Sequence, residues 1–394
     1  MTNIKSRLPR TVVLLGLVSF LNDLASDMVI PLIPLVLSGS LAAGPIALGL
    51  IEGVADAVAS LLKLWSGRHS DYLGGKRKGL TAAGYVLSNL SRPWIGAVAA
   101  WPMLLLLRSI DRVGKGIRSA PRDAMLADAT PLEMRGYAYG FHRMLDNAGA
   151  LAGALLAAAV IAFAHLSLTQ VILFSAIPGG LTILLIMAVP EAVHKSTSKE
   201  PLPPLAWLIL PPTTRRYLSI LLLFTFAKAS ETFIVLRGNE MGLSTVQLLL
   251  LWAALNLAKA MTSSVGGIAA DRLGRRQVMM ASWAAFGIAF CVLGQVISAQ
   301  GLWAATIAYG LAEGLSEGTE RALIADLAPP TRRGTAFGWY YLVTGIAAIP
   351  AGIAFGALWQ WSDAAVAFGT AGFLAIASAL LLSQIKLSSS DAMR

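Results

Sequence analysis

Long apolar segments recur along the whole of this 394-residue chain, and they constrain its fold more than any other feature. About 20 apolar residues in a helix cross the hydrocarbon core of a bilayer. Twelve segments of suitable length lie near residues 11–37, 45–66, 79–100, 102–121, 137–163, 168–190, 217–236, 245–265, 277–299, 302–324, 335–358 and 364–386. They lack the apolar–polar alternation of barrel strands. The sequence therefore predicts an all-α integral membrane protein with twelve transmembrane helices.

Composition excludes several classes of function. Hydrophobic residues make up 56% of the chain and charged residues only 13%, whereas soluble domains carry about 25% charge. The net charge of +10 would suit nucleic acid in a soluble protein, but in a membrane protein it reflects basic cytoplasmic loops. One cysteine and four scattered histidines offer no metal site. We expect a functional monomer that contacts lipid and a small-molecule substrate, with no nucleic acid, no cofactor and no enzymatic activity.

Lysine and arginine mark one set of connections between the predicted spans. These basic residues are Arg68, Lys76, Arg77, Lys78, Arg122, Arg135, Lys195, Lys199, Arg215, Arg216, Arg272, Arg275, Arg276, Arg321, Arg332 and Arg333. Basic loops stay on the cytoplasmic side, so we predict a bacterial inner-membrane protein with both termini in the cytoplasm. The proline-rich stretch 191–216 is the one long loop on that side. It separates a predicted N-terminal six-helix bundle (1–190) from a C-terminal one (217–394).

The two halves repeat each other. Residues 67–78 are echoed by residues 267–277, at a shift of 200. Asp128 and Pro131 are echoed by Asp326 and Pro329, at a shift of 198. Parallel repeats place a binding site near the bilayer midplane, between the halves. The repeat thus predicts two pseudo-symmetric bundles around a central site.

The repeated loop resembles a known family signature. Gly267, Asp271, Arg272, Gly274, Arg275 and Arg276 resemble the loop between the second and third helices of a half in the major facilitator superfamily, and Gly67, Asp71, Gly74, Lys76 and Arg77 resemble it in the first half. The resemblance covers the whole chain and implies the major facilitator fold with alternating access. Residues 112–116 resemble the fourth helix of many members. Gly149 and Gly153 resemble a motif of drug/proton antiporters, but Ala154 stands where that motif has proline.

Charged and glycine residues of these loops predict a cytoplasmic gate. Glycine lets helices approach closely, and aspartate pairs strongly with arginine. We expect Asp71 and Asp271 to pair in an outward-open state, with Arg122 and Arg321 as partners. The full predicted gate comprises Gly67, Asp71, Lys76, Arg77, Arg122, Gly267, Asp271, Arg272, Arg275 and Arg321. In the alternative interpretation, the basic residues only set the topology.

Ionisable residues also lie inside the predicted spans, where each costs roughly 2.5–3.5 kcal/mol to insert. Asp23 and Asp27 are four residues apart and share a helix face. Segment 102–121 carries a continuous basic stripe, and its repeat mate carries acidic residues. The basic residues are Arg108, Arg112, Lys115, Arg118 and Arg122, and the acidic ones are Glu313, Glu317 and Glu320. Such residues predict a polar cavity, or alternatively ion pairs that fix helix packing.

Two sets of candidate site residues follow. An aspartate whose arginine partner moves away can take up and release a proton, so the proton-coupling candidates are Asp23, Asp27, Arg112 and Glu231, with either aspartate opposite Arg112. The substrate-binding candidates are Asn22, Asp56, Arg108, Arg112, Lys115, Arg118, Arg143, Asp146, Lys228, Asn256, Glu313, Glu317, Trp339 and Tyr340. We predict proton-coupled efflux of a small polar or charged organic solute. The alternatives are proton-coupled import of an organic anion or metal-chelate, a channel, or a membrane enzyme.

Overall fold

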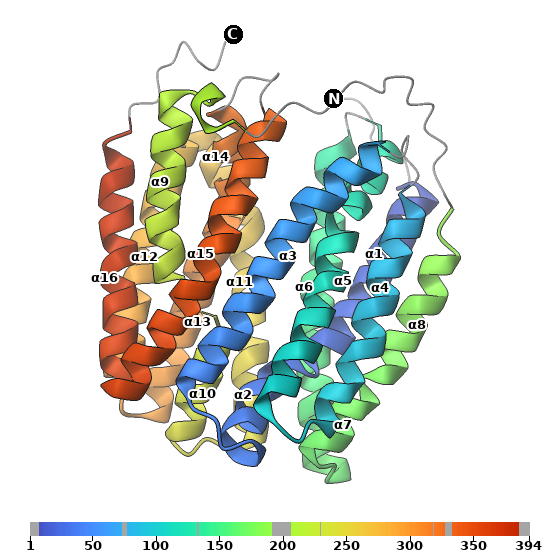
Figure 1. Ribbon diagram of the computed structural model, residues 1–394, viewed down its shortest axis with the longest axis vertical. Coiled ribbons are helices and arrows are strands. Elements are labelled where there is room, and N and C mark those ends of the chain that lie inside the picture. Colours follow the sequence, from blue (N-terminus) through green and yellow to red (C-terminus); the bar gives the residue numbers. More distant parts are fainter. Residues whose placement is uncertain are drawn as a thin grey trace.

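A computed structural model describes residues 8–72, 77–131, 134–190, 206–228, 230–317, 319–327 and 333–385. Within these ranges every regular element is a helix. Helices α1–α8 form the first half of the molecule and α9–α16 the second (Figure 1). Together they make twelve membrane-spanning segments in two bundles, so the predicted fold class is confirmed.

Six spans make up the first half. Their helices are α1 (Arg10–Asp27) continued by η1 (Ile30–Leu32), α2 (Ile33–Leu35) and the π-turn η2 (Val36–Ser40); α3 (Pro45–Tyr72); α4 (Lys78–Ser91) with η3 (Arg92–Ala97); α5 (Trp101–Asp128); α6 (Arg135–Ala164); and α7 (Leu168–Phe174) with α8 (Ala176–Met187). The first span breaks after Asp27 because Pro31 and Pro34 have no backbone N–H to donate. This break leaves Asp27 at a helix end inside the membrane.

Six further spans make up the second half. After the short turn η5 (Trp207–Ile209), the helices are α9 (Pro212–Ala227) with α10 (Thr232–Glu240), α11 (Thr245–Leu273), α12 (Arg275–Gln295), α13 (Ala299–Glu317) with α14 (Thr319–Asp326), α15 (Arg333–Trp361) and α16 (Ala364–Ser383). The predicted linker extended to residue 216, but α9 already begins at Pro212, a residue type suited to the first helical turn. Residues 191–205 of that linker lie outside the described ranges.

Charged residues keep some of the spans from being recognised by length and hydropathy. Nine of the described helical segments are long and apolar enough to cross a membrane by length and composition. Helix α5 is not among them, although Arg108, Asp111, Arg112 and Arg118 on it are all buried. Its charges are therefore enclosed by neighbouring helices and kept away from lipid.

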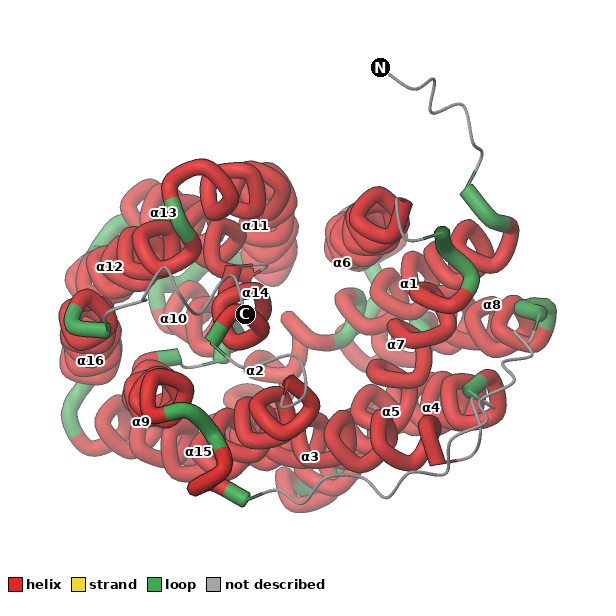
Figure 2. The backbone as a smooth tube through the Cα atoms, turned by 90° about the horizontal axis from the view of Figure 1, so that it is seen from above, coloured by secondary structure: helices red, strands yellow, loops and turns green. Residues whose placement is uncertain are grey.

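Both described ends of the chain, the start of α1 and the end of α16, lie at one end of the molecule, which we call the terminal face (Figure 1). We call the other end the opposite face. Seen from above, α9–α16 gather on one side and α1 with α4–α8 on the other (Figure 2). The halves meet where α3 packs against α15 and α6 against α11.

The contact between α3 and α15 is made by glycine backbone near the opposite face. A Cβ atom added to Gly49 would lie 1.9 Å from the carbonyl oxygen of Gly352, and one added to Gly356 would lie 2.3 Å from that of Pro45. A Cβ atom on Gly53 would lie 2.6 Å from the carbonyl oxygen of Ala348. No larger side chain fits at these positions, so the two backbones touch directly. We call this contact the glycine seam.

Candidate functional site

Two glycines orient α5 within the first half. A Cβ atom on Gly114 would lie 2.4 Å from the carbonyl oxygen of Gly84 on α4, and one on Gly116 would lie 2.5 Å from Cβ of Leu62 on α3. Helix α5 is therefore pressed against α4 on one side and α3 on the other. Its basic stripe occupies the face between these contacts, because residues three and four apart share a face.

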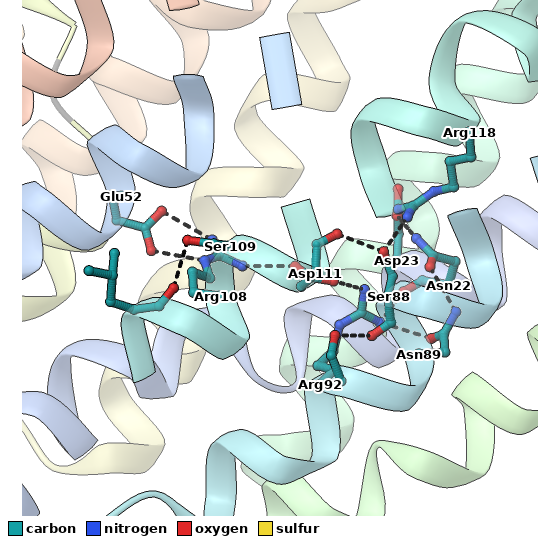
Figure 3. A network of polar contacts seen from close by, with 12 residues as sticks. Asn22, Asp23, Glu52, Ser88, Asn89, Arg92, Arg108, Ser109, Asp111 and Arg118 are labelled. Carbon is teal, nitrogen blue, oxygen red and sulfur yellow. Dashed lines mark hydrogen bonds and ion pairs between the residues drawn. The ribbon is translucent and has the colours of Figure 1, made fainter. Parts of the chain in front are cut away.

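Arg108 anchors a buried ion network on this face. Its Nε and Nη2 atoms donate to Oε1 and Oε2 of Glu52 on α3, each at 3.1 Å. Its Nη1 atom lies 3.3 Å from Oδ2 of Asp111, and Oδ1 of Asp111 accepts from Arg92 at 2.9 Å (Figure 3). All four residues are buried. Removing one member of such a buried pair typically costs about 3–5 kcal/mol, so this network holds α3, α4 and α5 together.

The network continues from Arg92 to Asp23. Arg92 donates to Oδ1 of Asn89 at 3.0 Å and to the backbone oxygen of Asn22 at 3.3 Å. Asn89 donates to the Asn22 side chain at 3.2 Å, and Asn22 donates to Asp23 at 2.8 Å (Figure 3). Arg118 donates to Ser88 at 2.6 Å and lies 4.7 Å from the centre of the Tyr85 ring. Sequence reasoning missed Arg92 and Asn89, although an arginine within the apolar run 79–100 was a usable signal.

In the described conformation, neither Asp23 nor Asp27 pairs with Arg112. Arg112 lies four residues before Gly116 and so shares the face that packs on α3. The charged groups that act on it most strongly are Arg108, Asp56, Asp111 and Glu52. Both aspartates have other partners, because Asp23 accepts from Asn22 and Asp27 accepts from α11. Spacing along one helix does not show which neighbour a face meets, and the pairing during the transport cycle stays a prediction.

Three cations of the stripe, Arg112, Lys115 and Arg118, form no ion pair among the described residues, but Arg118 donates to Ser88. Arg112 is only 8% exposed, and its Nε atom has no hydrogen-bond partner among the described residues. Lys115 is half-buried, and its ammonium forms no ion pair or hydrogen bond with the described part of the chain. The charged groups that act on it are, in order of strength, Arg112, Lys63, Asp23 and Arg118. Lys63 lies 5.9 Å from the centre of the Tyr341 ring, on the other half. Asp56 is exposed on α3.

Charged residues of the second half gather around the break between α9 and α10. Lys228 lies at this break, and its ammonium contacts Oε1 of Glu313 at 2.5 Å. Lys259 on α11 contacts both carboxylate oxygens of Glu231 at 2.8 Å, and Tyr309 donates to the same carboxylate at 3.1 Å. Oε2 of Glu313 has no hydrogen-bond partner among the described residues. The second half thus holds two lysine–glutamate ion pairs near the break between α9 and α10.

Tyr340 and Trp339 lie at the start of α15. Tyr340 donates to Glu320 at 2.8 Å. Trp339 packs edge-on against Trp207, with ring centres 5.0 Å apart. The side chain of Glu317 lies outside the described residues.

One hydrogen bond joins the two charged clusters across the halves. The indole Nε1 of Trp252 on α11 donates to Oδ1 of Asp27 at 2.8 Å, and both residues are buried. Asn256, one turn later, donates to the backbone oxygen of Trp252 at 3.0 Å and so acts within its own helix. Trp252 was absent from the sequence-based site because tryptophan in an apolar run is typical of lipid contact or core packing.

Helix α6 carries a smaller charged group. Nδ1 of His142 lies 3.4 Å from Oδ2 of Asp146, and Arg143 lies 3.7 Å from the same atom. Oδ1 of Asp146 has no hydrogen-bond partner among the described residues. The predicted residues Arg143 and Asp146 therefore contact each other, within a single helix.

Only part of the predicted gate lies among the described residues. Arg122 contacts Asp123 at 2.9 Å and donates to Ser19 at 2.9 Å, while Arg77 pairs with Asp128. Gly67 faces Ala120 on α5, Arg272 is exposed and Arg275 is half-buried. Lys76 and the side chains of Asp71, Asp271 and Arg321 lie outside the described residues, and so do the surroundings of Gly267. The pairing of Asp71 and Asp271 in an outward-open state therefore stays a prediction.

Comparison with known proteins identifies the family. The profile of the Major Facilitator Superfamily matches residues 15–258 and 217–388. An uncharacterized MFS-type transporter of Methanocaldococcus jannaschii is 32% identical over 385 residues, covering 95% of this chain and 94% of the relative. The predicted resemblance to this superfamily is thereby confirmed.

Solved structures share the fold. A human organic anion transporter superposes with a TM-score of 0.71 at 18% identity, covering 95% of this chain and 99% of that one. A D-xylose–proton symporter superposes with a TM-score of 0.75 at 15% identity, covering 96% and 98%. At such identities the likeness concerns the fold alone. The family match and the charged centre between two bundles lead to one conclusion: the chain belongs to the major facilitator superfamily and is a multi-pass membrane protein that acts as a secondary transporter, not as an enzyme.

Proposed function

We propose that this transporter couples proton movement to the export of a small charged organic solute. The observation that carries the proposal is the hydrogen bond from Trp252 to Asp27, because its two partners belong to different halves. Alternating access moves one half against the other. Asp27 therefore exchanges its donor for other surroundings during the cycle. A carboxylate whose hydrogen bonding changes also changes its affinity for a proton, which links protonation to conformation.

Asp23 and Glu231 complete the proposed coupling system. Asp23 lies one turn before Asp27 and ends the buried network that runs through Asn22 and Arg92. Glu231 lies at the corresponding break in the second half and is held by Lys259. Unlike Asp27, both residues have hydrogen-bond partners in their own half, so in this proposal they are further candidate protonation sites. A proton gradient supplies the energy in this proposal, and no cofactor is required.

The names of two fold neighbours and one motif support the proposed substrate and direction. The name of one fold neighbour is an organic anion transporter and that of another is a proton symporter, so the same fold accommodates charged solutes and proton coupling. Export is favoured by the resemblance of Gly149 and Gly153 to a motif of drug/proton antiporters. Import of an organic anion or metal-chelate is the second candidate, and counterflow in vesicles of both orientations separates the two.

The proposed setting is a bacterial inner membrane, with the terminal face in the cytoplasm. Arg77 directly precedes α4, and Arg122 and Arg272 lie in the last turns of α5 and α11, helix ends that lie at this face (Figure 1), as positively charged cytoplasmic loops require. The protein would act as a monomer, because both bundles and the charged centre belong to one chain.

Replacement of Asp27 by asparagine tests the coupling. Asp27→Asn keeps the size of the side chain and removes its titration. In proteoliposomes, we expect uptake driven by a pH gradient to collapse, while substrate exchange at equal pH survives because exchange needs no net proton movement. Asp23→Asn and Glu231→Gln are tested in parallel, because either carboxyl could carry the proton.

Glu240→Gln is a matched control. Glu240 also accepts from a tryptophan, Trp359, at 3.1 Å, but both residues lie in the second half. Rocking of the halves leaves that contact unchanged, so we expect normal coupling. If well-folded Asp23, Asp27 and Glu231 variants all still concentrate substrate under a pH gradient, proton coupling through these residues is wrong.

A further inference from the structure

We propose that the substrate carries an anionic group, a carboxylate or a phosphate, and that Arg112 and Lys115 on α5 bind it. This inference rests on the proposed function and deepens it by naming the substrate class. The two residues lie three apart, on the face of α5 between its contacts with α4 and α3. They therefore present two positive charges to the same side of the helix.

Close packing brings a third cation to this place. Because Gly116 has no side chain, α5 approaches α3 at Leu62, and Ser66 donates to the backbone oxygen of Gly116 at 2.9 Å. Lys63 follows Leu62 directly, and Lys115 precedes Gly116. Among charged groups, Arg112 and Lys63 act on Lys115 more strongly than any other. The crossing of two helices thus concentrates positive charge at one point.

The unpaired state of Arg112 indicates a missing anion. A buried charge in a membrane is stable only with a partner or a wet cavity. Arg112 is 8% exposed, its Nε atom has no hydrogen-bond partner among the described residues, and no described carboxylate forms an ion pair with it. Asp56 acts on it electrostatically without contact. A guanidinium presents a planar fork of N–H donors that matches a carboxylate or phosphate.

The other cations of the centre already have partners within the chain, and Arg118 donates to Ser88 and lies over the Tyr85 ring. Arg108 is held by Glu52 and Asp111, and Arg92 is held by Asp111. In the second half, Lys228 pairs with Glu313 and Lys259 with Glu231. Helix α5 therefore has two roles along one stripe. Arg108 fixes the bundle, whereas Arg112 and Lys115 are left to bind an anion from outside the chain.

Binding to matched pairs of probes tests this assignment. The purified full chain is mixed with benzoate or benzamide, succinate or succinamide, and glycerol 3-phosphate or glycerol, and its thermal stability is measured. A ligand that binds the folded state raises that stability by mass action. We expect at least one anion to stabilise the protein where its neutral counterpart does not. Stabilisation by no anion, or by neutral members equally, would overturn the proposal.

Charge-removing variants locate the bound anion. Loss of one charged hydrogen-bonding partner weakens binding by about tenfold or more, so we expect Arg112→Gln and Lys115→Gln each to reduce the affinity for that anion by at least this factor. Arg112→Lys and Lys115→Arg keep the charge and should retain more of the affinity than the glutamine variants. Lys78→Gln removes a cation that donates to Met187 on α8, away from the centre, and should bind normally. Unchanged anion affinity in both folded glutamine variants would refute the site.

The two proposals fail in different ways. If an anion binds and exchanges but no proton moves with it, the anion site stands and the coupling is wrong. If a cationic or neutral solute is transported with protons, the coupling stands and the anion site is wrong.

Discussion

At the scale of single residues, Trp252 on one half donates to Asp27 on the other at 2.8 Å. A hydrogen bond to a charged group contributes roughly 1.5–3 kcal/mol. Trp252→Phe keeps an aromatic ring and removes the donor. We expect the population of the described conformation, in which Trp252 and Asp27 are in contact, to fall about ten- to a hundredfold relative to the conformation in which the halves have moved apart at this contact. Spin labels at Gly79 and Gln277, exposed positions on different halves, report this change as a shifted distance distribution.

The control for this variant removes an equivalent donor within one half. Trp359→Phe deletes the indole that donates to Glu240 on α10. Its label distances should match those of the parent protein, in which the lone cysteine, Cys291, is replaced by serine. Identical distributions for Trp252→Phe and the parent would show that the contact does not bias the halves.

The sequence predicts which residues matter better than it predicts their partners. The spacing of Arg108, Arg112, Lys115 and Arg118 correctly places them on one face of α5, since all are buried or half-buried within the first half. Their division into network residues and unpaired cations could not be predicted. It depends on Glu52 and Arg92, which come from other helices and lie far away in the sequence. Pairing of buried charges is a tertiary property.

At the scale of elements, the glycine seam between α3 and α15 gives a direct test of how the halves close. Gly49→Ala would place a methyl group 1.9 Å from the carbonyl oxygen of Gly352. Overpacking of this kind costs about 1–3 kcal/mol or more, so we expect the opposite face to open and transport to slow. Ser38, which lies 3.5 Å from Asn239 of the other half, reports opening as faster modification of a Ser38→Cys variant by a thiol reagent.

Gly369→Ala in α16 is the matched control, because nothing lies within 4 Å of the added methyl group. It should transport normally and leave the labelling of Ser38→Cys unchanged. Equal labelling in the Gly49→Ala and Gly369→Ala backgrounds would mean that the seam does not hold this face closed.

Apolar run length predicts the spans well and their interruptions poorly. Helix α6 begins at Arg135 and ends at Ala164, close to the predicted 137–163. The first and seventh spans are each read as continuous, yet α1 ends at Asp27 and α9 at Ala227. Pro31 and Pro34 signal the first break. Nothing comparable signals the second, where the backbone turns at Lys228 with a ψ angle of 75°.

At the scale of the whole molecule, the orientation of the chain in the membrane is open to a labelling experiment. In cells that express the Cys291→Ser parent, an impermeant thiol reagent should modify cysteines at Ser40 and Gln300, which are exposed on the opposite face. It should not modify one at Gly79, which is exposed on the terminal face. The reason is the excess of basic residues at the terminal face. Labelling of Gly79→Cys in intact cells would invert the orientation.

The arrangement of the chain in two similar bundles could be predicted, because the same motifs recur in the sequence about 200 residues apart. Helices α3 and α11, which carry the start of the repeated segments, end at Tyr72 and Leu273, at the terminal face of their bundles (Figure 1). Substrate identity has no such signature. Chains that share this fold at 15–18% identity include a D-xylose–proton symporter and an organic anion transporter. The side chains in the centre, such as Arg112 and Lys115, must therefore carry that information.

The unpaired Arg112 and Lys115 have an electrical consequence. If they load a monovalent anion that leaves the cell in exchange for one entering proton, two elementary charges cross the membrane in the same electrical direction per cycle. Each is worth roughly 2.3 kcal/mol per 100 mV, so the membrane voltage contributes about 4.6 kcal/mol at that potential. Import of the same anion with one proton moves no net charge. Export would therefore be driven by the membrane potential and would be measurable as an inward current. Import would carry no net current.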